Sequence, residues 1–149
     1  MTFKQPRSVQ VVVFSRRNRG LEYLLLKRVT EQGGFWQTVT GSLEASETHR
    51  EAARREVMEE TGIAINIDDL IELGITNVFE IAPKWRWKYA PQVTHNEEVC
   101  FAVEVDKLKV RIDPLEHQEY RWVDYQAAIG MLQWDSSKHA LSSVHKMIE

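Results

Sequence analysis

One stretch of the chain carries both a start signal and a stop signal for a single helix. Thr48 followed three residues later by Glu51 forms a capping box, in which each side chain bonds the backbone amide of the other residue. Gly62 supplies the left-handed conformation that ends many helices. Ala53 and Val57 lie four residues apart, so both can pack inward on one face. The sequence therefore predicts a helix that starts at Thr48 and stops after Thr61, at Gly62.

The same helix carries three carboxylates on one side. Glu56, Glu59 and Glu60 stand at positions i, i+3 and i+4, which share one face of a helix. At 4 Å and an effective dielectric constant of about 20, one pair of like charges costs roughly 4 kcal/mol. A hard cation such as Mg²⁺ or Mn²⁺ offsets this repulsion because it selects carboxylate oxygens. A solvated acidic helix face is the alternative, but it does not explain the positions of the glycines.

Those glycines belong to a longer pattern, residues 41–63. Gly41 is followed after five residues by Glu47, and after seven more by the run Arg-Glu-Val-Met-Glu-Glu-Thr-Gly-Ile. The segment resembles a complete Nudix box, so the chain is identified as a member of the Nudix hydrolase family. The length of 149 residues predicts a single domain over residues 1–149. The resemblance implies that it hydrolyses a nucleoside diphosphate linked to another group. It also implies an α/β fold, an α/β/α sandwich with a mixed β-sheet and a loop–helix–loop catalytic motif.

The resemblance assigns roles to residues within the box. Glu56, Glu59 and Glu60 correspond to the carboxylates that bind the cation, Mg²⁺ or in its place Mn²⁺. Arg55 is expected to orient these carboxylates, a task that suits the planar guanidinium group. Cleavage of a phosphoanhydride requires a cation to neutralise the polyphosphate, a positioned water and a group that takes its proton.

Residues at the start of the box have supporting roles. Gly41 is expected to let the backbone come close to metal or phosphate, since it has no side chain. The carbonyl oxygen of Thr40 is a weaker candidate for a metal ligand. Glu47 and Glu44 are interpreted as support, and for Glu44 an ordinary surface position is the alternative.

Members of the family recruit a further carboxylate from outside the box, and three candidates are present. Glu97 and Glu98 directly precede the expected strand of residues 99–105, and Glu116 precedes the expected strand of residues 120–123. Without the resemblance, Glu116 would be interpreted as an ordinary solvated loop residue.

Four segments outside the box, residues 3–6, 35–42, 88–96 and 116–124, resemble a bacterial subgroup of the family that acts on dihydroneopterin triphosphate. In that subgroup the carboxylate at the position of Glu116 binds metal. The substrate is held at the positions of Lys4, Arg28, Thr40, Phe79, Glu80, Ile81 and Ala82. A weaker match at residues 7–10 makes the assignment of Lys4 less direct.

The residues themselves leave alternatives open at these positions. Arg28 ends a strand and can grip a phosphate, or form a salt bridge at the rim. Trp36 and Phe79 can stack on a flat bicyclic ring, although aromatic residues at strand ends more often belong to the core. Residues 85–88 alternate Trp and basic residues, which as a strand would place two indoles on one face.

Apolar alternation predicts strands outside the box. The strands expected are residues 8–14, 22–28, 36–40, 63–67, 71–81, 99–105 and 120–123, the first two joined by a turn at residues 17–20. Residues 126–132 and 138–148 are expected to be helical. Helices on both faces of a mixed sheet follow from this order.

Composition excludes several other classes of protein. The net charge is −3 and no basic run is present, so a nucleic-acid polymer is not an expected partner. A single cysteine, Cys100, excludes an internal disulfide and a cysteine-based zinc site. No apolar run of about 18 residues and no signal peptide is found, so no membrane partner and a cytoplasmic location are expected.

The expected function is metal-dependent release of pyrophosphate from dihydroneopterin triphosphate, leaving the monophosphate. A nucleotide-pool pyrophosphatase acting on dATP or oxidised purine triphosphates is a second possibility, since pterin and purine rings have similar shapes. A non-catalytic Nudix-fold ligand-binding module is the third, although no carboxylate of the box is missing. The attacked phosphorus, the general base, the number of metal ions and the oligomeric state are left open.

Overall fold

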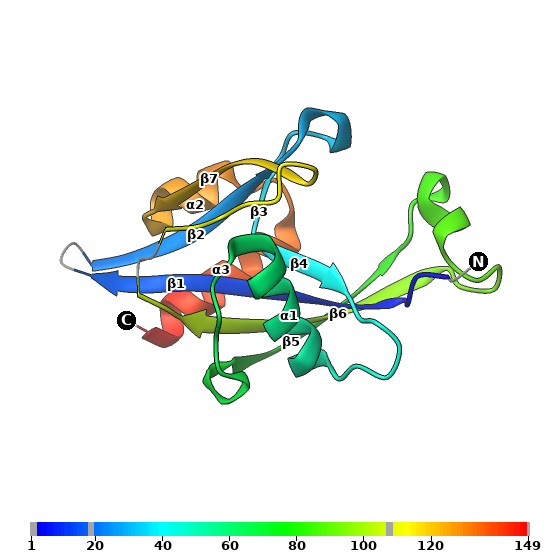
Figure 1. Ribbon diagram of the computed structural model, residues 1–149, viewed down its shortest axis with the longest axis horizontal. Coiled ribbons are helices and arrows are strands. Elements are labelled where there is room, and N and C mark those ends of the chain that lie inside the picture. Colours follow the sequence, from blue (N-terminus) through cyan, green and yellow to red (C-terminus); the bar gives the residue numbers. More distant parts are fainter. Residues whose placement is uncertain (1–2, 18–19, 107–108, 149) are drawn as a thin grey trace.

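The computed structural model describes residues 3–17, 20–106 and 109–148 (Figure 1). The strands are β1 (Arg7–Arg17), β2 (Gly20–Arg28), β3 (Trp36–Gln37), β4 (Val39–Ser42), β5 (Ile71–Glu80), β6 (His95–Glu104) and β7 (His117–Val123). The α-helices are α1 (His49–Thr61), α2 (Tyr125–Met131) and α3 (Asp135–Ile148), and short 3₁₀ helices are η1 (Thr30–Gln32), η2 (Ile67–Asp69) and η3 (Pro83–Lys88). Within these residues, no helix has the length and apolar character needed to cross a membrane.

The strands form one mixed sheet in which β1 is central. The order is β3-β2-β1-β6-β5, with β4 also paired to β1 and β7 also paired to β2. The pairing of β1 with β6 is parallel and the other pairings are antiparallel. β2 pairs with residues 14–17 of β1, whereas β4 pairs with residues 8–11. The start of the box, on β4, is therefore joined to the first half of the central strand.

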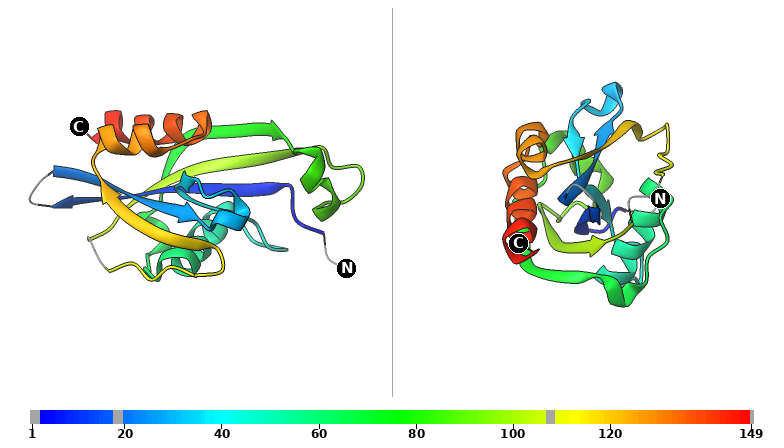
Figure 2. Two further views of the ribbon diagram at one scale, coloured as in Figure 1. Left: turned by 90° about the horizontal axis from the view of Figure 1, so that it is seen from above. Right: turned by 90° about the vertical axis from the view of Figure 1, so that its left-hand side faces the viewer.

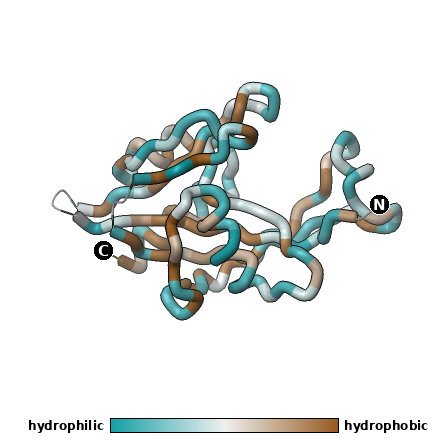
Figure 3. The backbone as a smooth tube through the Cα atoms, in the orientation of Figure 1, coloured by the Kyte–Doolittle hydropathy of each residue, from teal (hydrophilic) through white to brown (hydrophobic). Residues whose placement is uncertain are grey.

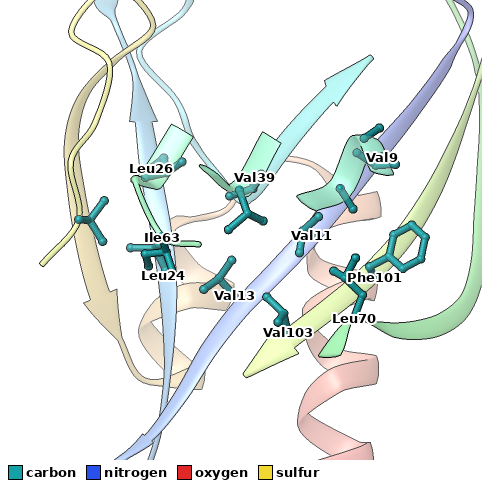
Figure 4. Packing of buried hydrophobic residues seen from close by; sticks show 14 of the residues in the cluster. Val9, Val11, Val13, Leu24, Leu26, Val39, Ile63, Leu70, Phe101 and Val103 are labelled. Atoms are coloured by element: carbon teal, nitrogen blue, oxygen red, sulfur yellow. The ribbon is translucent and has the colours of Figure 1, made fainter. Parts of the chain in front are cut away.

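Helices cover both faces of this sheet, as the sequence predicted (Figure 2). Successive side chains of a strand point to opposite faces. Accordingly, Val9, Val11 and Val13 of β1 pack in one buried cluster with α1, and Val12 and Phe14 pack in a second cluster with α3. Figure 4 shows the first cluster, and Figure 3 shows hydrophobic residues along β1. Burying one such side chain contributes about 1.5–3 kcal/mol.

The strand expected at residues 63–67 is wrong. Residues 63–66 form an irregular connection that follows α1, and Ile67 begins η2. Ile63, Ile65 and Ile67 nevertheless pack against the core on the α1 side. The alternation of apolar and polar residues in this segment arises because the isoleucines contact the core. It does not indicate hydrogen-bonded pairing with another strand.

The strand considered for residues 85–88 is also wrong. These residues lie in η3, which begins at Pro83, and the fixed backbone angle of proline suits the first turn of a helix. η3 connects β5 and β6 at a projecting end of the molecule (Figure 1). Of the turn expected at residues 17–20, Asn18 and Arg19 lie outside the described residues.

Candidate active site

Helix α1 begins and ends as its sequence predicts. The Thr48 hydroxyl accepts a hydrogen bond from the Glu51 amide at 3.1 Å, and the Glu51 carboxylate accepts one from the Thr48 amide at 2.9 Å. Gly62 has a φ of 74° and donates its amide hydrogen to the carbonyl of Met58. Ala53 and Val57 are fully buried against the sheet. The positions of the two helix ends and of the buried residues Ala53 and Val57 determine which side of α1 carries the glutamates.

Gly41 lets the backbone of β4 approach the Glu56 carboxylate. A Cβ atom at position 41 would lie 2.1–2.5 Å from the carboxylate atoms of Glu56, closer than real Cβ contacts allow. The sequence predicted that the backbone at Gly41 would come close to metal or phosphate. In the described residues, the group that lies close to this backbone is the carboxylate of Glu56.

Arg55 is the centre of an ion-pair network. Its Nε lies 2.7 Å from Oε2 of Glu47 and its Nη2 lies 2.9 Å from Oε1 of the same residue, a bidentate contact. Its Nη1 contacts Oε1 of Glu56 at 2.5 Å and Oε2 of Glu59 at 3.2 Å. Its Nη2 also donates to the carbonyl of Ser42 at 2.9 Å. The guanidinium therefore ties the loop before α1 to two of the three helical carboxylates.

The supporting glutamates contact the same network. Glu47 accepts a hydrogen bond from the Glu44 amide at 2.8 Å, and its bonds to Arg55 hold its pKa below the usual value. Glu44 lies 3.3 Å from Arg55 and is largely exposed. Both residues thus lie where support for Arg55 was expected.

Glu60 is the most deeply buried carboxylate of the group. It is 2% exposed, and its Oε1 has no hydrogen-bond partner among the described residues. Burial raises its pKa well above the usual value, and the nearby carboxylates of Glu56 and Glu116 raise it further. A hydrogen bond from the backbone of Thr40 acts in the opposite direction. Such a group is stabilised by an added positive charge.

Glu116 approaches this cluster from the loop before β7. Its backbone is fixed by hydrogen bonds from its amide to Asp113 and from the Val29 amide to its carbonyl, both 3.0 Å. Burial raises the pKa of Glu116, and Glu56 and Glu59 contribute to the rise, whereas Arg28 opposes it. The structure thus places Glu116 within electrostatic reach of the box.

The two other candidates for an added carboxylate lie elsewhere. Glu97 is exposed on β6. Glu98 is buried on the face of the sheet that α3 covers, opposite α1, where it contacts Gln10 and Asn77. Neither residue joins the cluster around Glu60.

His117 is a site residue that the sequence did not reveal. It is fully buried, with Nε2 3.0 Å from the amide nitrogen of Gln37 and 3.9 Å from Oε1 of Glu60. Burial lowers the pKa of His117 to about 4, and the positive charge of Arg28 contributes to this shift. The imidazole is therefore neutral at physiological pH. Its position directly after Glu116 was the available signal in the sequence.

Cations border the carboxylates on one side. Burial, Lys88 and Arg28 lower the pKa of Lys4, while Glu56 and Glu116 oppose this change. The Lys4 amide also donates to the carbonyl of Lys88 at 2.7 Å. Lys4 and Arg28 thus lie within electrostatic reach of Glu116, and Lys4 also lies within reach of Glu56. Lys88 is an additional cation at this rim, and its ammonium lies over the rings of Trp85 and Trp87.

The remaining residues expected to hold substrate are more scattered. Trp36 packs with the core on the α3 side, with Lys27 and Arg121 over its ring, which favours the structural alternative. Phe79 is 45% exposed at the end of β5. The others are Glu80, which pairs with Arg86 at 3.3 Å, the buried Ile81, and Ala82, the N-cap of η3.

The carboxylates have the donor chemistry for a hard cation but are not arranged as a finished metal site. Among residues 3–17, 20–106 and 109–148, no three His, Cys, Asp or Glu side chains are grouped so that they could hold a metal ion. Arg55 explains part of this arrangement because its ion pairs turn Glu56 and Glu59 toward the guanidinium. The unpartnered Oε1 of Glu60 is the atom best placed to accept a cation.

Comparisons with known proteins give the family and the fold. The NUDIX domain family model matches residues 4–143. The chain is 34% identical to dihydroneopterin triphosphate diphosphatase of Haemophilus influenzae, over 95% of this chain and 88% of that protein. It is 36% identical to the protein of the same name from Escherichia coli K12, over 93% and 91%. The solved structure of the E. coli dihydroneopterin triphosphate pyrophosphohydrolase superimposes with a TM-score of 0.80, 34% identity, and coverage of 95% and 96%.

Proposed function

This chain belongs to the Nudix hydrolase family, and we propose that it cleaves dihydroneopterin triphosphate to dihydroneopterin monophosphate and pyrophosphate. The relatives named for this activity match nearly the full length of the chain. The observation that carries the proposal is that Glu116, Lys4 and Arg28 lie within electrostatic reach of one another and that Lys4 and Glu116 lie within reach of Glu56 of the box. A polyphosphate placed between them would meet both the positive rim and the carboxylates that hold its counter-ion.

Hydrolases of this family need divalent cations, and Mg²⁺, or Mn²⁺ in its place, is the proposed ion here. The residues that would hold it are Glu56, Glu59, Glu60 and Glu116. They fit a hard cation because they are oxygen ligands whose mutual repulsion a cation offsets, and because Oε1 of Glu60 has no described partner. When bound, the ion neutralises charge on the phosphates and makes a coordinated water more acidic.

The remaining tasks fall to side chains of the chain itself. Arg28 and Lys4 would contact the phosphate oxygens, and the guanidinium of Arg28 is suited to a bidentate contact. Arg55 would keep Glu56 in place through the network with Glu47. Phosphoryl transfer depends mainly on such positioning and on charge stabilisation, so these contacts account for much of the proposed catalysis.

Product analysis on a substrate panel tests this proposal. The purified chain is incubated with Mg²⁺ and dihydroneopterin triphosphate, GTP, dATP or 8-oxo-dGTP, and products are separated by chromatography. We expect the highest kcat/KM for dihydroneopterin triphosphate, with pyrophosphate and the monophosphate as products. Equal or higher kcat/KM for a nucleoside triphosphate would favour a nucleotide-pool pyrophosphatase, and binding without turnover would favour a non-catalytic module. Release of orthophosphate in place of pyrophosphate would contradict the proposed reaction.

A further inference from the structure

A cluster of polar side chains is buried on the face of the sheet opposite α1. Its members come from β1, β5 and β6 and from the residue before β4, and all except Asn77 are at most 9% exposed. They are Ser8, Gln10, Thr38, Asn77, Asn96 and Glu98, and we refer to them as the polar cluster. The network around Arg55 does not include any of them.

The strand registers place these residues side by side. Gln10 pairs with Cys100, which packs in the buried cluster of α3, and Glu98 is two residues away on the same face of β6. Asn77 is in register with Glu98 across the antiparallel pair of β5 and β6. Figure 2 shows α3 packed over one end of the sheet, whereas the ends of β5 and β6 that lead to η3 extend beyond it. Three members of the polar cluster, Asn77, Asn96 and Glu98, belong to these ends of β5 and β6.

The hydrogen bonds of the cluster leave acceptor atoms without donors. Oε1 of Glu98 accepts from the side-chain amides of Gln10 and Asn77, both at 3.1 Å. The described hydrogen bonds of Glu98 all end on Oε1, and Oε2 is not among the fully buried atoms without a partner, so it is open to a further donor. Asn96 donates to the Ser8 hydroxyl at 2.7 Å, while its buried Oδ1 has no described partner. A ligand that fits here therefore has to supply N–H donors.

A purely structural role accounts poorly for a carboxylate at this position. Burying an ionised group is costly unless hydrogen bonds satisfy it, and the two amides that reach Glu98 both bond the same oxygen, Oε1. The next residues on the same face, Cys100 and Ala102, show that the sheet accepts small apolar side chains there. Burial also raises the pKa of Glu98, in line with this cost.

An exposed aromatic ring lies beside the polar cluster. Phe79 is in register with Asn96, so the two side chains share a face, and Phe79 is also two residues from Asn77 on β5. Directly opposed side chains on antiparallel strands have Cβ atoms about 4.5–5.5 Å apart. A flat heterocycle stacked on the half-exposed Phe79 would therefore direct its polar edge toward Asn96 and Glu98.

The polar cluster adjoins the candidate active site through one pair of strands. Gln10 is the register partner of Thr40, whose backbone hydrogen-bonds Glu60, and Thr40 precedes the Gly41 that faces Glu56. Among the described strands, β4 pairs only with β1, so its other edge has no strand beside it. A ligand can therefore place its ring on one face of β4 and its phosphates on the other.

We propose that Glu98, with Phe79 and Asn96 beside it, binds the 2-amino-4-oxopyrimidine edge of the substrate ring. This edge presents an amino group next to a ring N–H, two donors that a carboxylate accepts together. Pterins and guanine share it, hypoxanthine has the ring N–H without the amino group, and adenine lacks the ring N–H. This inference rests on the proposed function, because it adds recognition of the ring to the cleavage of the triphosphate at the carboxylates of α1.

The test compares GTP with ITP, because the two substrates differ only in the 2-amino group. A site that hydrogen-bonds this group rejects the analogue that lacks it. We expect kcat/KM of the wild type to be at least about tenfold higher for GTP than for ITP. In Glu98→Gln the preference should fall below about threefold, because the amide of Gln presents only one acceptor oxygen and no longer favours the substrate with two donors. The matched control is Glu97→Gln, the exposed neighbour on the other side of β6, which should keep the wild-type preference.

Two outcomes would overturn the inference: a wild type that cleaves GTP and ITP equally, or a Glu98→Gln variant that keeps the full preference. The wild-type comparison needs no variant, so misfolding of Glu98→Gln would not remove the test. Calorimetric binding of 7,8-dihydroneopterin, which carries no phosphate, provides a second readout without catalysis. Wild-type binding that Glu98→Gln loses supports the inference, and equal binding by both contradicts it. Failure of the wild type to release pyrophosphate from the pterin triphosphate would count against the proposed function alone.

Discussion

The two faces of the sheet each bury a glutamate whose pKa is raised, and the causes differ. Burial raises the pKa of Glu60, and the like charges of Glu56 and Glu116 add to this effect. Burial also raises the pKa of Glu98, but the amides of Asn77 and Gln10 oppose the rise. Repelling carboxylates are stabilised by a cation, whereas a single carboxylate among amides is stabilised by N–H donors. The difference separates a face for phosphate chemistry from a face for ring recognition.

Loss of charge at Glu60 should have the largest effect. Glu60→Gln keeps the shape of the side chain, and we expect turnover to fall by at least about 10²-fold, or roughly 2.7 kcal/mol of barrier. Mn²⁺ affinity, followed by calorimetry, should fall as well. The melting temperature without metal should rise, since the substitution relieves repulsion from Glu56 and Glu116. Wild-type turnover together with unchanged Mn²⁺ affinity would show that Glu60 is not a ligand.

A side chain at position 41 should act through displacement of Glu56. In Gly41→Ala the new Cβ meets the Glu56 carboxylate, the mobile end of a side chain, so the fold should survive while Glu56 moves. Misplacement of a catalytic group by about 1 Å can cost about 10²-fold, and we expect a loss approaching this value in steady-state kinetics. The control is Gly130→Ala, because a Cβ atom at that position of α2 meets nothing within 4 Å. Full activity of Gly41→Ala would mean that the position of Glu56 is unimportant.

Glu116 should matter less than Glu60 because it is less buried and Arg28 already opposes its repulsion. Glu116→Gln removes a charge from the same cluster, and we expect turnover to fall by about tenfold or more, roughly 1.4 kcal/mol of barrier. Glu97→Gln, which alters an exposed carboxylate on β6, should stay within a few-fold of the wild type. If the two variants lose activity equally, the added carboxylate does not act from the loop before β7.

The smallest effect expected concerns stability at Glu98 and its dependence on pH. The folded-state pKa of Glu98 lies above its unfolded value, so this group stabilises the fold fully below about pH 4.5 and progressively less as the pH rises through the folded-state pKa. A tenfold difference in proton affinity between the folded and unfolded states corresponds to about 1.4 kcal/mol of stability. Urea unfolding from pH 4 to pH 8 should therefore show Glu98→Gln gaining stability relative to the wild type as the pH increases. Parallel pH profiles for the two proteins would mean that Glu98 titrates normally.

Local sequence signals predicted the helix of the box and most of the strands. The capping box at Thr48, the stop at Gly62 and the spacing of the glutamates all act within one helix, so no knowledge of distant residues was needed. The loop at Glu116 was reached only through resemblance to a subgroup of the family. The structure places it near the box by pairing β7 with β2, which is a non-local event.

The features that the sequence did not predict depend on contacts between distant strands. Glu98 was one of three candidates for an added metal ligand, and alternation along β6 does not tell which face meets α1. His117 became recognisable only when folding buried it beside Gln37 and Glu60. The expected strand at residues 63–67 failed for the same reason, since packing against the core and pairing in a sheet produce the same apolar alternation.

The division between the two faces can be tested most directly by measuring kcat/KM for dihydroneopterin triphosphate and ITP with Glu60→Gln and Glu98→Gln in parallel. We expect Glu60→Gln to lower both values by the same factor, about 10² or more, because the phosphates of both substrates meet the same carboxylates. Glu98→Gln should lower the value for the pterin by about tenfold and leave that for ITP within about threefold. Equal losses for both substrates in Glu98→Gln, or a change of substrate preference in Glu60→Gln, would contradict the division.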